Sequence, residues 1–146
     1  MEALTLRWEA VDSPSHCARL SDSKSGKQTR PLGIAALDHL ALFRPESAKP
    51  NDYVFTGKGK SGHYVGAPKA WSRIIKQAKL AHISLHGLRH WFASAAAEMN
   101  YSELVIAGLL GHSARGVTGR YATTPDTALV AAADAVSRRL NESLEG

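Results

Sequence analysis

Hydrophobic and polar residues alternate along much of the first third of the chain, as they do in strands with one buried face. The segments "LTLRW", "HCARL" and "QTRPLG" fit this alternation, and the polar, glycine-containing segment "SDSKSGKQ" joins the last two as a hairpin turn. The segment "YVF" at residues 53–55 is expected to form a further short strand. The pattern therefore predicts a small antiparallel sheet near the N-terminus.

The remainder of the chain has the apolar spacing that is typical of helices. One helix is expected at residues 34–43, and others begin at Pro68, near Ser84, after the N-cap Ser102 and at Thr124–Pro125. The helix after Ser102 is apolar nearly all round, which predicts burial, and it should stop at Gly111. The chain is therefore predicted to be α+β, mainly α-helical, with a small antiparallel sheet.

The faces of the other helices can also be predicted from the spacing. Four groups of residues share a face: Leu88, Trp91, Phe92 and Ala95 for a core; Leu129, Ala132, Val136 and Leu140 in the last helix; Trp71, Ile74, Ile75 and Ala78 as an apolar stripe; and Lys69, Arg73 and Lys76 as a basic face suited to a phosphate backbone.

Length and composition indicate one folded domain. The chain has 146 residues, of which 44% are hydrophobic, and its apolar runs fall short of the roughly 20 residues that cross a bilayer. The first residues carry acids and no long apolar run, unlike a secretory signal. Cys17 is the one cysteine, so no internal disulfide is expected and a reducing cytoplasm is the expected setting.

The positive charge is concentrated in one region. The chain has a formal net charge of +5, but residues 22–79 contain eleven Lys and Arg against four Asp and Glu, a net +7, and the remainder has a net −2. Such a distribution favours a polyanionic partner such as nucleic acid. It is equally compatible with a solvated surface, so the chemistry of the motifs has to decide.

Neither a metal site nor a nucleotide site fits the motifs. His86 and His90 have the spacing of a zinc-binding helix, but Gly87 stands where a zinc protease needs glutamate, and no carboxylate lies close to the pair in sequence. The segment "TGKGKSGHYVGAP" is rich in glycine and lysine but does not have the frame of a P-loop. We expect no metal and no cofactor.

The segments "SLHGLRHWF" and "LLGHSARGVTGRY" contain a set of residues that suits phosphodiester chemistry. A tyrosine hydroxyl can attack phosphorus if fixed cations and hydrogen-bond donors meet the developing negative charge. The planar fork of arginine can bind two phosphate oxygens, and His or Lys can give the leaving oxygen a proton. His86, Arg89, His112 and Tyr121 would supply such groups.

These motifs resemble the catalytic domain of the tyrosine recombinases, the phage integrase family. The segments "HGLRH", "LLGHS" and "GRY" occur in the family's order, and Tyr121 follows His112 at the characteristic nine-residue step. Upstream, "LRWEAVD" and "SKSGKQTRPLG" resemble the family's strand pair and lysine-bearing hairpin, so the likeness covers nearly the whole chain. The resemblance implies the catalytic-core fold of DNA breaking-rejoining enzymes.

The resemblance also implies roles for individual residues. Tyr121 would be the nucleophile, forming a 3′-phosphotyrosyl DNA intermediate and releasing a 5′-hydroxyl. Arg89 would hold the scissile phosphate, His112 would hydrogen-bond one of its oxygens, and His86 would assist proton transfer at the nucleophile. Lys24 would be the general acid, with Lys27 in the same turn as a competitor. His90 follows the family pattern but is interpreted as structural.

The sequence departs from the family pattern at its start. The family has another active-site arginine three residues before the glutamate that Glu2 resembles, which places it ahead of Met1, and neither Arg7 nor Arg19 matches it. The preceding helices and the separate N-terminal core-binding domain have no counterpart either. We therefore expect residues 1–146 to be a catalytic domain without these parts. An inactive remnant that only binds DNA or protein is the alternative.

The resemblance implies two partners, double-stranded DNA and other recombinase protomers. Members of the family often pack a C-terminal helix onto a neighbouring protomer, and here the last helix carries an apolar stripe. Packing of that stripe against its own core is the other interpretation, and the sequence leaves both open. A bacterial or phage origin with association to the nucleoid is expected.

Overall fold

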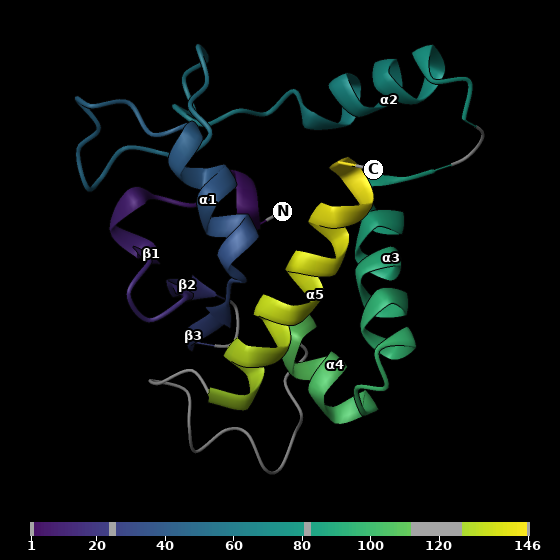
Figure 1. Cartoon of the computed structure of the whole chain (residues 1–146). Coiled ribbons are helices and arrows are strands. Elements are labelled where there is room, and N and C mark those ends of the chain that lie inside the picture. The colour runs from purple at the N-terminus through teal and green to yellow at the C-terminus, as the bar shows by residue number, and fades with distance from the viewer. Residues whose placement is uncertain (1, 24–25, 81–82, 112–126, 146) are drawn as a thin grey trace.

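The computed structural model describes residues 2–23, 26–80, 83–111 and 127–145, and its elements form a small sheet and a helical layer (Figure 1). Two 3₁₀ turns, η1 (Glu2–Thr5) and η2 (Trp8–Ala10), precede the strands β1 (Val11–Asp12), β2 (Cys17–Ser23) and β3 (Gly26–Pro31). The helices are α1 (Ile34–Leu42), α2 (Ala67–Gln77), α3 (Leu85–Glu98), α4 (Glu103–Leu110) and α5 (Thr127–Glu145). The predicted α+β class, mainly helical, is confirmed.

The sheet is antiparallel with the order β1-β2-β3. Cys17 pairs with Pro31 and Ala18 with Arg30 across the β2–β3 hairpin, and the register shifts between Leu20 and Ser23. The strands predicted from "HCARL" and "QTRPLG" are thus present. A core of Leu6, Trp8, Ala18 and Val54 packs on the sheet.

Two of the predicted strands are wrong. The "LTLRW" segment instead enters two 3₁₀ turns, and "YVF" takes part only in an isolated bridge between Arg7 and Tyr53. The backbone N–H of Val54 donates to the carbonyl oxygen of Leu6 at 2.8 Å, so the two segments do lie side by side. Leu6 and Trp8 still alternate into the core, but the backbone pairs at too few positions to make a ladder.

Helix α5 lies between α1 and α3 in Figure 1 and carries the second core. Val136 is fully buried and Ala132 is nearly so. Val136 forms a cluster with Ala95 and Ala96 of α3, and Leu140 packs against this cluster. The predicted stripe therefore packs against the helices of its own chain. Thr124 and Pro125, the predicted start of this helix, lie outside the described residues.

The helix caps at Ser84 and Ser102 are confirmed, but part of the predicted burial is wrong. Ser84 Oγ accepts from Gly87 N at 3.0 Å, and Ser102 Oγ accepts from Val105 N at 3.4 Å. Helix α4 is only half-buried, with Leu104 62% exposed, and on α3 the side chains of Leu88 and Trp91 are 40% and 46% exposed. The apolar faces of these helices are wider than the neighbouring elements can cover.

Helix α2 lies apart from the other helices, at the upper right of Figure 1. The indole N–H of Trp71 donates to the carbonyl oxygen of Ile83 at 2.7 Å, which ties α2 to the segment entering α3. Ile74 is 50% exposed, so the stripe predicted for this helix is only partly covered. Within the described part of the chain, no helix is both long and apolar enough to span a membrane.

Candidate functional site

The first two turns of α3 carry His86, Arg89 and His90. The cap by Ser84 fixes the start of the helix, and the spacing of three and four residues puts the side chains on neighbouring positions of its surface. The two imidazole rings meet edge to face, with centroids 4.7 Å apart and planes at 87°. Both histidines are exposed and Arg89 is half-buried. The helix therefore brings two imidazoles and one guanidinium together.

Arg89 connects α3 to the C-terminal end of α4. Its Nη2 donates to the carbonyl oxygen of Leu110 at 2.7 Å. Carbonyls in the last turn of a helix have no partner within the helix and carry partial negative charge, so a guanidinium is stabilised there. The bond uses one of the five N–H donors of the planar guanidinium group.

Arg30 of β3 also reaches this helix end, which no sequence motif indicates. Gly111, which ends α4, has φ +68°, a left-handed conformation that favours glycine. A Cβ on Gly111 would overlap the guanidinium of Arg30. Only the tertiary arrangement of β3 and α4 shows the approach, because the hairpin segment that contains Arg30 lies about 80 residues before Gly111 and no motif links the two.

An open groove lies beside His86. It has a volume of about 740 Å³, and its walls come from α2 and from the start of α3. The side chains that line it are mostly apolar, with Lys76 and His86 as the ionisable ones; they include Trp71, Ile75, Leu80 and Ile83. His86 is therefore open to a ligand at one side.

Three of the predicted site residues, Lys24, His112 and Tyr121, lie outside the described residues. Of the five, the structure places His86 and Arg89, which share α3. His112 follows Gly111 directly in the sequence, so Arg89 contacts the helix end that leads to it. The roles assigned to all five, and the structural role assigned to His90, stay predictions.

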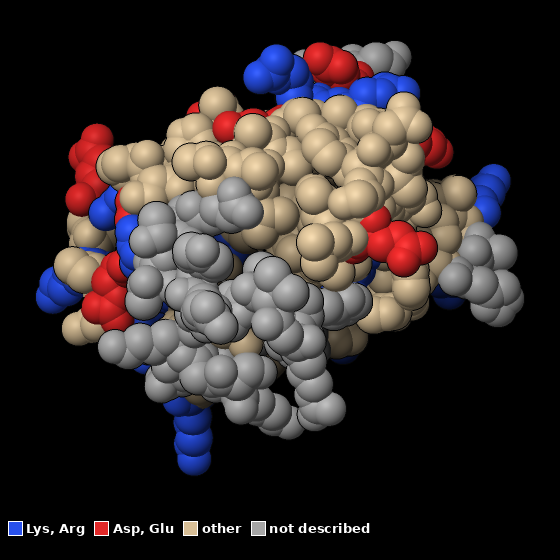
Figure 2. All heavy atoms as spheres, turned by 90° about the horizontal axis from the view of Figure 1, so that it is seen from below, with Lys and Arg blue, Asp and Glu red and all other residues tan. Residues whose placement is uncertain are grey.

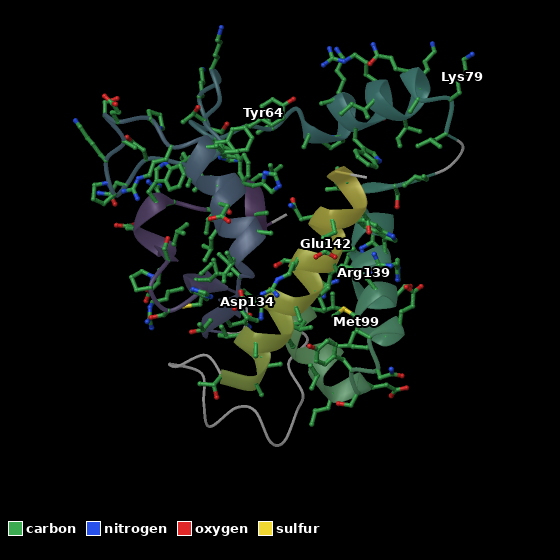
Figure 3. The ribbon with its side chains drawn as sticks, viewed as in Figure 1. Tyr64, Lys79, Met99, Asp134, Arg139 and Glu142 are labelled. Carbon is green, nitrogen blue, oxygen red and sulfur yellow. The ribbon has the colours of Figure 1, made fainter. Side chains whose placement is uncertain are left out.

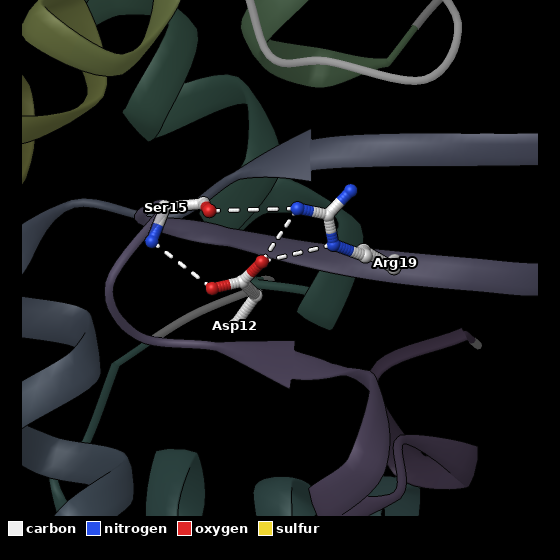
Figure 4. A network of polar contacts seen from close by, with 3 residues as sticks. All are labelled: Asp12, Ser15 and Arg19. Carbon is white, nitrogen blue, oxygen red and sulfur yellow. Dashed lines mark hydrogen bonds and ion pairs between the residues drawn. The ribbon is translucent and has the colours of Figure 1, made fainter.

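Arg7 and Arg19 are engaged away from α3. Arg7 donates to the carbonyl oxygen of Asn51 and, at 3.0 Å, to the hydroxyl of Tyr53. Arg19 donates to Asp12 Oδ2 through Nε at 2.9 Å and through Nη2 at 2.6 Å (Figure 4). These hydrogen bonds from Arg19, with the backbone N–H of Ser15, lower the pKa of the Asp12 carboxyl. Both arginines therefore serve local structure.

The basic residues of α2 project into solvent. Lys69, Arg73 and Lys76 are exposed, and Lys79 points away from the body of the molecule at the end of the helix (Figure 3). On the face seen in Figure 2, Lys and Arg stand at the rim beside Asp and Glu and do not merge into one patch. Part of the basic character of residues 22–79 is thus an exposed row along α2. The described residues contain no group of three His, Cys, Asp or Glu side chains placed to hold a metal ion.

Comparison with known proteins gives a consistent result. The model of the phage integrase family matches residues 1–127. The chain is 32% identical over 114 residues to the prophage integrase IntF of Escherichia coli K12, covering 76% of this chain and 24% of that protein. It is 27% identical over 140 residues to the shufflon-specific DNA recombinase of Escherichia coli, covering 94% of this chain and 34% of that protein.

The chain thus spans about a quarter of the first relative and a third of the second. No solved structure matches it significantly. The family match covers most of the chain, including "HGLRH", "LLGHS" and the tyrosine that follows them. The chain therefore belongs to the phage integrase family.

Proposed function

We propose that this chain is the catalytic domain of a site-specific DNA recombinase, which cuts and rejoins double-stranded DNA through a 3′-phosphotyrosine at Tyr121. The observation that carries the proposal is the hydrogen bond from Arg89 to Leu110. It joins the helix that bears His86 and Arg89 to the end of the helix that leads, in the sequence, to His112 and Tyr121.

In the proposed reaction the Tyr121 oxygen attacks the scissile phosphorus while the bond from phosphorus to the 5′-oxygen breaks. Arg89 and His112 stabilise the charge that develops on the phosphate oxygens. His86 takes the phenolic proton, and Lys24 gives a proton to the leaving 5′-oxygen. The phosphotyrosyl ester retains the energy of the broken bond, so attack by a 5′-hydroxyl reverses the step and the reaction needs neither metal nor nucleotide.

The proposed partners are double-stranded DNA and further copies of the recombinase. The exposed basic residues of α2 suit contact with a phosphate backbone. Assembly through α5 would require this helix to leave its present place, because Val136 and Ala132 are buried against its own chain. Assembly through α5 is therefore the part of the proposal that the packing favours least.

The polarity of cleavage tests the proposed reaction. Nicked duplexes of randomised sequence would carry sulfur in place of the scissile 5′-oxygen, because a thiolate leaves without a proton and cannot readily reverse the step. The strand labelled at its 5′ end should become attached to protein on a denaturing gel, and the strand labelled at its 3′ end should be released with a 5′-thiol. Attachment of the 3′-labelled strand would contradict the mechanism. DNA binding without any adduct would favour the alternative, a remnant that only binds DNA.

A further inference from the structure

Two arginines from distant parts of the chain meet the C-terminal end of α4. Arg89 comes from α3 and donates to the carbonyl oxygen of Leu110 at 2.7 Å. Arg30 comes from β3, and its guanidinium lies where a Cβ of Gly111 would stand. Leu110 and Gly111 are consecutive residues, so the two guanidinium groups approach one short piece of backbone from two different elements.

The backbone of the site is built to admit Arg30. Gly111 adopts φ +68° at the end of α4, and the absence of a side chain lets the guanidinium lie directly on the main chain. On the other side, Arg30 is held by the hairpin ladder, in which it pairs with Ala18. The half-buried side chain of Arg30 thus starts in the sheet and ends with its guanidinium beside the glycine.

We propose that Arg30 is a second phosphate-binding arginine, which contacts the same phosphodiester group of DNA as Arg89; this rests on the proposed function. Guanidinium groups are planar forks that bind phosphate oxygens in pairs. Two guanidinium groups beside one helix end raise the positive potential there, which attracts a phosphate group. The partial negative charge of the carbonyls at the end of α4 helps to hold both groups at this place.

A purely structural role makes a different prediction. If Arg30 served only to fill the space over Gly111, its loss would lower the stability of the fold but would not change how DNA binding responds to salt. A phosphate contact instead contributes about 0.9 to the slope of log K against log salt for duplex DNA. The salt dependence of binding therefore separates the two roles.

The first experiment compares Arg30→Gln with Arg139→Gln in the full 146-residue chain, by titration of a randomised duplex at several salt concentrations. Arg139 is exposed, about three turns along α5 from Leu129, and its Nη1 donates to Ser143 Oγ at 3.1 Å. Both variants lose one positive charge. We expect the slope to fall by about 0.9 in Arg30→Gln and to stay unchanged in Arg139→Gln. Arg30→Lys keeps the charge and should keep the slope.

A second measurement does not depend on the folding of a variant. The Nε–H signals of Arg30 and Arg89 are followed by nitrogen-15 NMR in the wild-type chain as duplex is added, with Arg30→Lys used only for assignment. Both signals should shift together. If the wild-type chain binds DNA but the Arg30 signal and the slope of Arg30→Gln do not change, the inference is wrong and the proposed function stands. If the wild-type chain does not bind DNA, the inference about Arg30 and the proposed function are both wrong.

Discussion

The carboxylate of Asp134 on α5 caps the N-terminus of α1: its Oδ1 accepts a hydrogen bond from the backbone N–H of Ile34 at 2.7 Å. Its Oδ2 lies 3.2 Å from Nδ1 of His16, which directly precedes β2. Asp134 lies on the side of α5 that faces α1 and the sheet (Figure 3). One carboxylate thus joins the helical layer to the sheet and replaces the side-chain cap that Gly33 cannot supply.

Asp134→Ala should therefore destabilise the fold. Loss of a helix cap costs about 1 kcal/mol, and the contact with His16 adds to it. Asp134→Asn keeps an oxygen that can accept from Ile34, so it should lose less. Urea denaturation of the wild type and the two variants measures this order of stability. Equal stability of wild type and Asp134→Ala would show that the cap contributes nothing.

Val136 should be critical for stability, and Leu144 on the same helix should not. Val136 is fully buried, whereas Leu144 is 73% exposed. Val136→Ala removes two buried methyl groups and leaves a cavity, which should cost roughly 2 kcal/mol, and Leu144→Ala should cost less than about 0.5 kcal/mol.

Thermal denaturation measures the cost of both substitutions, and for the wild type it also shows where α5 packs. If the helix folds onto its own chain, the Tm of the wild type will not depend on protein concentration. A Tm that rises with concentration would show that α5 is exchanged between protomers.

The pair of Asp12 and Arg19 makes stability depend on pH. Hydrogen bonds from Arg19 lower the pKa of Asp12 below its ordinary value of 3.8. A carboxyl with a lowered pKa binds fewer protons in the folded state, so its stabilising contribution is present above pH 3.8 and is lost as the pH falls. The difference in unfolding free energy between wild type and Asp12→Asn should be constant at neutral pH and shrink in acid. A difference that grows in acid would contradict the assignment.

The roles of Lys24 and Lys27 can be separated by the leaving group. If Lys24 is the general acid, Lys24→Ala should slow cleavage of ordinary DNA by about 10²-fold or more. On DNA with sulfur in place of the scissile 5′-oxygen it should react almost as fast as wild type. Lys27→Ala should be normal on both substrates. The opposite result, a defect in Lys27→Ala that sulfur rescues, would exchange the two roles.

Local signals in the sequence predicted local structure well. Ser84 and Ser102 cap helices as expected, and the spacing of Ala132 and Val136 identified the buried side of α5. These features depend on residues close in sequence. The alternation of Leu6 and Trp8 was also meaningful, since both are buried, but it did not reveal that 3₁₀ turns precede Leu6 and begin at Trp8.

Long-range features could not be predicted in this way. Trp91 was expected in the core, yet it is 46% exposed because the packing of α3 against its neighbours turns it outward. Arg30 was interpreted only as part of a hairpin, because its approach to Gly111 depends on how β3 and α4 are placed. The family motifs identified His86 and Arg89, but they could not show that Arg89 donates to Leu110.

Covalent trapping of DNA tests the central claim, that Tyr121 is the nucleophile. We expect a covalent adduct to accumulate on the sulfur-activated nicked duplex, because the released thiolate does not readily reverse the step. The adduct, digested and analysed by mass spectrometry, should map to Tyr121 and should be absent in Tyr121→Phe. Tyr101, which is half-buried beside the core of α3 and α5, supplies the matched control, so Tyr101→Phe should still form the adduct. An adduct that persists in Tyr121→Phe, or that maps to another residue, would contradict the claim.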